Sequence, residues 1–213
     1  MTKHAANFWT GGLSKPSKMP CKGYSLPATE CLLGSRLRSV SGSVCVSCYA
    51  LKGRYTFPNV QNAMARRYGC TMRALEDATT REHYVNAFVR LLEHETHFRW
   101  HDSGDLQSDA HLDLIVEIAK RLPQTSFWLP TREWKLVTAW RRAGGVFPDN
   151  LTVRMSAQMI DGPVPSTDLP TSGVHTHGNS QGRKCPAPTT DGHCGSCRAC
   201  WDANVKHVSY LKH

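Results

Sequence analysis

Hydrophobic and polar residues recur with two different periods between residues 59 and 155, and these periods predict alternating helices and strands. Residues 59–78, and a second stretch that ends near residue 95, place apolar side chains every three or four positions, which is typical of amphipathic helices. The same period returns over residues 108–122 and 131–143. Residues 98–100, 127–129 and 151–155 are short apolar runs between these helices, and we interpret them as strands.

This order of elements predicts an α/β fold, because strands joined through helices pair in parallel. We expect a partial (βα) barrel or a small parallel sheet flanked by helices, since a full eight-stranded barrel takes about 250 residues. The chain has 213 residues. We assign residues 1–160 to the α/β core, including an N-terminal cysteine loop. Residues 161–213 form a Gly/Pro-rich crossover and a cysteine-rich, metal-binding C-terminal segment packed on that core.

Local signals predict where helices begin and where loops lie. Thr79 and Glu82 have the spacing of a capping box, and Ser108 and Thr131 are expected to cap the helices that follow them. Residues 33–44 and 161–184 are rich in Gly and Ser, so we predict that both are loops.

Polar side chains follow the predicted strands at the end where α/β proteins bind ligands. His101, Asp102 and Asp105 come after one strand, and Arg132 and Glu133 come after the next. The carboxyl ends of parallel strands share one edge, so these five residues are candidates for binding a cofactor or substrate. No Ser-His-Asp arrangement, P-loop or Gly-x-Gly-x-x-Gly sequence is present, which argues against hydrolase, NTPase and nicotinamide-dependent functions.

The C-terminal segment contains four closely spaced cysteines: Cys185, which precedes a proline, and Cys194, Cys197 and Cys200, each two residues from the next. Four-cysteine iron–sulfur sites use this C-x2-C-x2-C run with a separate Cys-Pro ligand. Structural zinc sites more often pair two separated knuckles, and two-residue gaps leave little room for disulfides among neighbours. The pattern favours a [4Fe-4S] cluster, with zinc as the alternative.

A second cysteine group lies near the N-terminus and consists of Cys31, Cys45 and Cys48. Three thiolates on one loop would leave one iron of a [4Fe-4S] cluster free to bind another molecule. The seven cysteines allow two clusters, or one cluster with ligands from both groups. Cys21 and Cys70 have no partner at ligand spacing, and we expect them to pack as small apolar side chains.

Composition and charge indicate the cellular compartment of the protein and the class of molecule it binds. Nine cysteines, no apolar leader at the N-terminus and no apolar run of membrane-spanning length favour a cytoplasmic protein that binds metal. The net charge of +9 indicates attraction to nucleic acid, and basic residues recur as pairs. These pairs are Arg36 with Arg38, Lys52 with Arg54, Arg66 with Arg67, and Arg141 with Arg142. Solvated helix and loop faces would give the same pattern.

Four motifs in this order resemble the phage gene-product-88 family of actinobacterial phages: Cys-x-x-Cys-Tyr-Ala-Leu-Lys-Gly at 45–53, Phe-Arg-Trp-His-Asp-Ser-Gly-Asp at 98–105, Phe-Trp-Leu-Pro-Thr-Arg-Glu at 127–133, and the 194–201 cysteine run. The resemblance covers roughly residues 18–213 and implies a phage protein in the host cytoplasm.

The first two motifs are also similar to the start of radical-SAM-like barrels, in which three cysteines hold a cluster that binds S-adenosylmethionine. Cysteine gaps of thirteen and two depart from the usual three and two. In such a barrel the C-terminal cysteines would hold an auxiliary cluster.

Three functional hypotheses follow from these features. The first is a non-catalytic iron–sulfur protein that binds nucleic acid or a host protein, or senses redox state. The second is a radical-SAM-like enzyme whose catalytic cluster is held by the N-terminal cysteines. The third is a structural zinc module.

Overall fold

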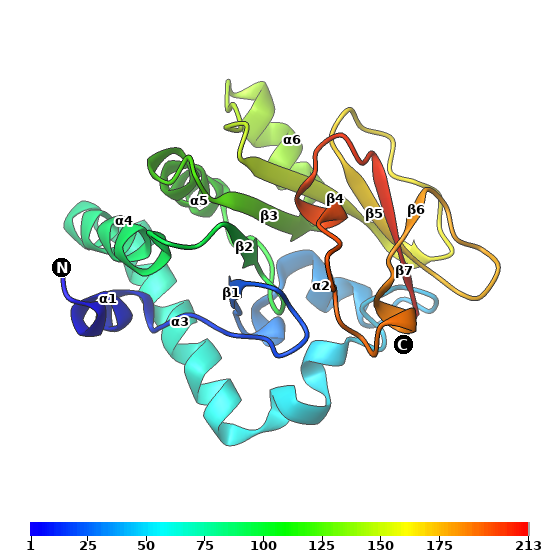
Figure 1. Ribbon diagram of the computed structural model, residues 1–213, viewed down its shortest axis with the longest axis horizontal. Helices are drawn as coiled ribbons and strands as arrows, with labels where there is room; N and C mark the ends of the chain where they lie inside the picture. The colour runs from blue at the N-terminus through cyan, green and yellow to red at the C-terminus, as the bar shows by residue number, and fades with distance from the viewer. Residues whose placement is uncertain (213) are drawn as a thin grey trace.

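The protein is built on an open, entirely parallel sheet in the computed structural model, which describes residues 1–212. Seven strands form the sheet: β1 (Lys22–Tyr24), β2 (His97–Trp100), β3 (Ser126–Thr131), β4 (Leu151–Ile160), β5 (Thr171–His175), β6 (Arg183–Lys184) and β7 (His207–Leu211). Their order is β1-β2-β3-β4-β5-β7-β6, and each neighbouring pair runs parallel (Figure 1). The first five strands follow chain order, as in a barrel that does not close, and the predicted α/β class is confirmed.

Helices cover one face of this sheet. α4 (Ala78–Leu92), α5 (Asp109–Arg121) and α6 (Trp134–Arg142) succeed one another alongside β2, β3 and β4 (Figure 1). α1 (Lys3–Thr10) and α3 (Pro58–Glu76) pack on α4, and α2 (Leu32–Leu37) lies in the loop after β1. Short 3-10 turns occur at η1 (Ala28–Glu30), η2 (Tyr49–Leu51), η3 (Gly53–Thr56), η4 (Ala187–Thr189) and η5 (Ala199–Trp201).

Alternation along the strands separates an apolar core from a second, more polar face. Phe98 and Trp100 on β2 enter the main core beneath the helices, as do Phe127 and Leu129 on β3. The intervening Trp128 packs on the opposite face in a smaller cluster with Cys21 and Trp201. The strand period of two therefore gives β2 and β3 one face for packing and another for a site.

The face opposite the helices carries the C-terminal segment. Trp128 on β3 packs there with Trp201, and Tyr210 on β7 packs against the same cluster. Arg99 on β2 lies over the Trp128 ring. The segment around η5 crosses this face, where Trp201 Nε1 donates to Phe98 O at 2.8 Å.

The predicted helices and strands between residues 58 and 160 are confirmed, with two changes at helix starts. The capping box at Thr79 is wrong, because Asp77 caps α4 by accepting from Thr80 N at 2.6 Å. Ser108 caps α5 as predicted. Thr131 does not cap a helix: it ends β3, and its hydroxyl donates to Asp105 Oδ1 at 2.6 Å.

Both predicted loops contain regular structure. Residues 33–44 include most of α2, and residues 161–184 include β5 and β6. β5 reads Thr-Ser-Gly-Val-His, too polar to be recognised as a strand, and it is stabilised by pairing between β4 and β7. Strands from the predicted core and from the predicted C-terminal segment thus form one sheet.

Candidate metal centre

The four C-terminal cysteines line one small cavity. Cys185 follows β6, and its backbone N–H donates to Ser209 O of the neighbouring β7 at 2.8 Å. Cys194 is placed by its N–H, which donates to Lys18 O at 3.3 Å, and Cys200 lies in η5. Cys185, Cys194, Cys197 and Cys200 border the cavity together with Pro186 and Trp201. Residues predicted from spacing alone to form a group therefore lie together.

One buried arginine attaches this cysteine segment to the sheet. Arg154 on β4 is fully buried, and its guanidinium donates four hydrogen bonds of 2.9–3.0 Å to backbone carbonyls. The acceptors are the carbonyls of Thr171, Ala199, Asp202 and Val205. Three of these four belong to the segment that carries Cys200, so Arg154 anchors that segment together with the Trp201 contacts.

The three N-terminal cysteines form a second group in the loop that follows β1. A side chain at Gly34 would meet Cys31 Cβ at 2.8 Å, Cys31 Sγ at 3.5 Å and Cys45 Sγ at 3.7 Å, so both sulfurs lie beside this glycine. Burial raises the pKa of Cys31, and the nearby Asp105, Cys48 and Cys45 raise it further. The mutual influence of the three thiols agrees with their grouping on one loop.

Polar residues at the strand ends hold this loop in place. Glu133 Oε1 accepts from Leu33 N at 2.8 Å, and Val44 N donates to Gln158 O at 2.9 Å. The Tyr49 hydroxyl donates to the Asp102 carbonyl. The loop after β1 is thereby bound to the ends of β2, β3 and β4, the edge at which the sequence predicted a site.

Asp102 and Asp105 are both buried and satisfied by other protein groups. Asp102 accepts from Ser25 Oγ at 2.7 Å and Tyr55 Oη at 2.9 Å. Asp105 accepts from Leu106 N, Thr131 Oγ1 and Arg132 N at 2.6–2.9 Å. These hydrogen bonds join the loops after β2 and β3, so the carboxylates stabilise this edge of the sheet.

His101 is buried against α5. Its backbone has a φ of 52° and its ring lies 5.2 Å from that of His111 on α5, within the main core. Burial lowers the pKa of His101 well below the ordinary histidine value, with His111 and Arg99 adding to the effect. The structure therefore brings Asp102, Asp105, Arg132 and Glu133 to the loop of the N-terminal cysteines. It buries His101 beside His111 instead.

Cationic side chains adjoin both cysteine groups. Burial raises the pKa of Cys45, and the charge of Arg132 opposes the rise. Burial raises the pKa of Cys200 to about 11, and Tyr210, Arg154 and Arg99 oppose it. Metals bind thiolates, so cations that favour the thiolate form suit a metal-binding site.

Arg99 and Cys21 are site neighbours that the sequence analysis missed. Arg99 lies with its guanidinium carbon 4.4 Å from the Trp128 ring centroid on the face opposite the helices. Its charge opposes the rise in pKa that burial causes at Tyr49 and at Cys194. Cys21 is buried beside Trp128 and Trp201, where burial raises its pKa to about 12 against the effect of Arg99. The alternation of β2 would have placed Arg99 opposite the core, whereas nothing in the sequence brings Cys21 to the C-terminal group.

The cysteines are not arranged around a single metal ion. Over the described residues 1–212, no three Cys, His, Asp or Glu side chains form a group that could hold one ion. The four C-terminal thiols are instead distributed around their cavity, each partly buried and free.

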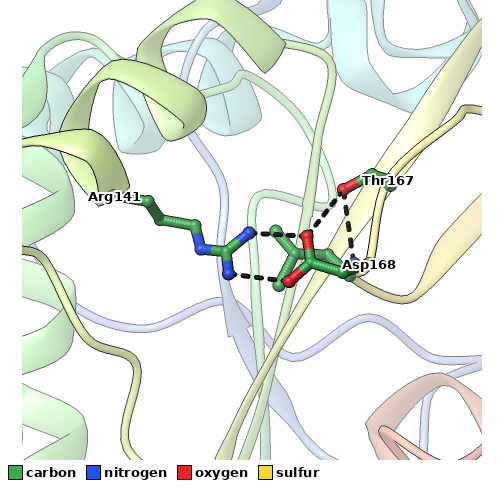
Figure 2. Close-up of polar contacts among 4 residues, drawn as sticks. Arg141, Thr167 and Asp168 are labelled. Atoms are coloured by element: carbon green, nitrogen blue, oxygen red, sulfur yellow. Dashed lines mark hydrogen bonds and ion pairs between the residues drawn. The ribbon is translucent and has the colours of Figure 1, made fainter.

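In two of the predicted basic pairs, one arginine is engaged within the protein. Arg141 makes a two-pronged ion pair with Asp168, both contacts 2.7 Å long (Figure 2). Arg67 is buried and donates to Gly12 O at 2.7 Å. These two arginines are therefore not free to bind a polyanion.

Comparison with known proteins places the chain in a family. The family model described as Gene product 88 matches residues 1–203. The chain belongs to the gene product 88 family. No curated protein and no solved structure matches the chain. Within residues 1–212, no helix combines the length and the apolar character needed to cross a membrane.

Proposed function

We propose that this gene product 88 protein binds a [4Fe-4S] cluster through Cys185, Cys194, Cys197 and Cys200. The observation that carries the proposal is the cavity that these four cysteines line together. The donor set consists of thiols, which are the usual ligands of iron–sulfur clusters, and Cys185 precedes a proline as one ligand often does.

The spacing of the cysteines favours a cluster over zinc. Structural zinc sites more often pair two separated knuckles. A C-x2-C-x2-C run with a separate Cys-Pro ligand is instead typical of four-cysteine iron–sulfur sites. The apolar neighbours Pro186 and Trp201 also limit solvent access to such a cluster, which influences its reduction potential.

A second candidate function is a radical-SAM-like enzyme, favoured by the position of Cys31, Cys45 and Cys48. Their loop directly follows β1 at the carboxyl edge of an open parallel sheet, where ligands of such folds bind. A cluster on these three thiolates would supply an iron able to bind S-adenosylmethionine. The protein's own residues would position that loop through Glu133 and Gln158 and stabilise the Cys45 thiolate through Arg132.

Iron and acid-labile sulfide content after anaerobic purification tests both candidates. About four irons per chain in the wild type, lost in Cys197→Ser and kept in Cys48→Ser, is expected for one C-terminal cluster. About eight irons, halved by either substitution, would indicate two clusters and support the enzyme. Cys70→Ser is the matched control, because Cys70 is buried in the main core and lies in neither cysteine group.

Zinc in a colourless wild-type protein would contradict both iron–sulfur candidates. If two clusters are present, the enzyme further requires that the reconstituted protein bind S-adenosylmethionine and that its reduced cluster cleave it. A protein with about eight irons that does neither would exclude the enzyme and leave the cluster-binding function. Binding of a host protein stays a prediction.

A further inference from the structure

The positive charge of the chain is concentrated in one segment. Residues 31–75 contain seven basic residues and no acidic residue, whereas residues 76–213 contain fifteen basic and sixteen acidic residues. The segment comprises the N-terminal cysteine loop, η2, η3 and nearly all of α3, and it occupies the lower part of the view in Figure 1. Three carboxylates from the strand ends lie against the segment, those of Asp102, Asp105 and Glu133. Seven cations against three carboxylates leave a net positive charge, so this region of the surface should attract polyanions.

Most of these cations face solvent without an acidic partner. Arg36, Lys52, Arg54, Arg66 and Arg73 are exposed. Within residues 1–212 none of the five forms an ion pair, although Arg81, Arg90 and Arg141 elsewhere in the chain do. Cations left unpaired at the surface keep their charge available for a ligand.

Exposed aromatic rings lie among these cations. Tyr49 is 52% exposed and Phe57 is 54% exposed, and Lys52 and Arg54 lie between them in the chain. Tyr49 and Tyr55 both donate to Asp102, so their hydroxyls fix the segment to the end of β2 while about half of the Tyr49 side chain stays in solvent. Exposed aromatic rings beside unpaired cations provide the combination of stacking and charge by which proteins bind single strands.

We propose that residues 49–57, together with the cations of α2 and α3, bind single-stranded nucleic acid. Single strands are bound by positive grooves or faces that track the phosphates and by aromatic rings on which bases stack. A duplex offers phosphates but keeps its bases paired, so it would not use Tyr49 and Phe57. The proposal depends on charge and exposure and is independent of the metal.

Fluorescence anisotropy with a labelled 20-nucleotide oligo-dT, and with a duplex of equal length, tests the proposal on the full chain. The double variant Lys52→Glu/Arg54→Glu should weaken oligo-dT binding at least tenfold, because it reverses two charges that no carboxylate of residues 1–212 pairs. It should also lower the salt slope by about 1.4, the value expected for two lost phosphate contacts on a single strand. Phe57→Ala should weaken binding at least fivefold through lost stacking.

The matched control is Lys135→Glu/Arg142→Glu on α6, which changes the net charge equally at exposed positions outside the segment. It should retain affinity within threefold. Equal weakening by both double variants would show that binding follows total charge and would overturn the proposal. So would duplex binding as tight as oligo-dT binding with no effect of Phe57→Ala, which would indicate a general polyanion surface. Absence of binding to either oligonucleotide at 50 mM salt would also reject it.

Discussion

Arg154→Met is expected to detach the C-terminal cysteine segment from the sheet. The guanidinium is fully buried and satisfies four carbonyls that no other side chain of residues 1–212 contacts. Methionine has similar length and no donor. Each buried carbonyl left without a donor costs about 1–3 kcal/mol. The backbone N–H groups of Asp202 and Val205 still donate to the Ala199 and Asp202 carbonyls, so only the other two carbonyls lose the donor that the guanidinium supplies. Taking the lower end for these two, we expect a loss of about 2 kcal/mol in the free energy of unfolding.

Denaturation with guanidinium chloride, followed by tryptophan fluorescence, measures this loss, because Trp201 lies in the segment that Arg154 holds. The matched control is Arg121→Met, since Arg121 donates to Asn86 Oδ1 at an exposed position on α5. The control should lose less than about 1 kcal/mol. Iron content should fall in Arg154→Met and not in Arg121→Met. A loss below about 1 kcal/mol in Arg154→Met, with iron retained, would refute the reasoning that this arginine anchors the segment.

Three further predictions concern pH and backbone conformation. Burial lowers the pKa of His111 to about 3, so the unfolded chain binds a proton below pH 6.5 that the folded chain does not. Through this residue the free energy of unfolding of the wild type should be about 2 kcal/mol lower at pH 5 than at pH 8. Urea titrations at the two pH values should show that this difference is about 2 kcal/mol smaller in His111→Asn. An equal difference in both proteins would contradict the linkage. The hydrogen bond from Arg141 lowers the pKa of Asp168 to about 2, so its contribution is present above about pH 4 and is lost towards pH 2. The pair is exposed, so Asp168→Asn should change the free energy of unfolding at pH 7, measured by thermal denaturation, by less than about 0.5 kcal/mol. A larger loss would contradict the conclusion that this ion pair contributes little. Gly104 has a φ of 85° and an added Cβ would lie 2.6 Å from Leu26 Cβ, whereas Gly144 has a φ of 96° and open space. Gly104→Ala should therefore cost at least about 2 kcal/mol more than Gly144→Ala in denaturant titration, and equal costs would show that the loop after β2 yields.

The sequence by itself determined the elements whose stability is local. Amphipathic periods predicted α3 to α6, and short apolar runs predicted β2, β3 and β4, because the side chains that bury these elements recur at regular intervals. Their alternation predicts a parallel sheet, and the strand ends of a parallel sheet place Asp102, Asp105, Arg132 and Glu133 at one edge. Cysteine spacing likewise grouped Cys185 with Cys194, Cys197 and Cys200.

Only the tertiary structure decided the rest, because those features depend on partners distant in the chain. β5 is a strand through pairing with β4 and β7, since its own residues are too polar to predict one. Arg154 and Cys21 lie 45 residues or more from several groups they contact, so no local pattern identifies them. Arg99 lies over Trp128, which packs with Trp201 of the C-terminal segment, and this contact forms only once the sheet brings residues about 100 positions apart together.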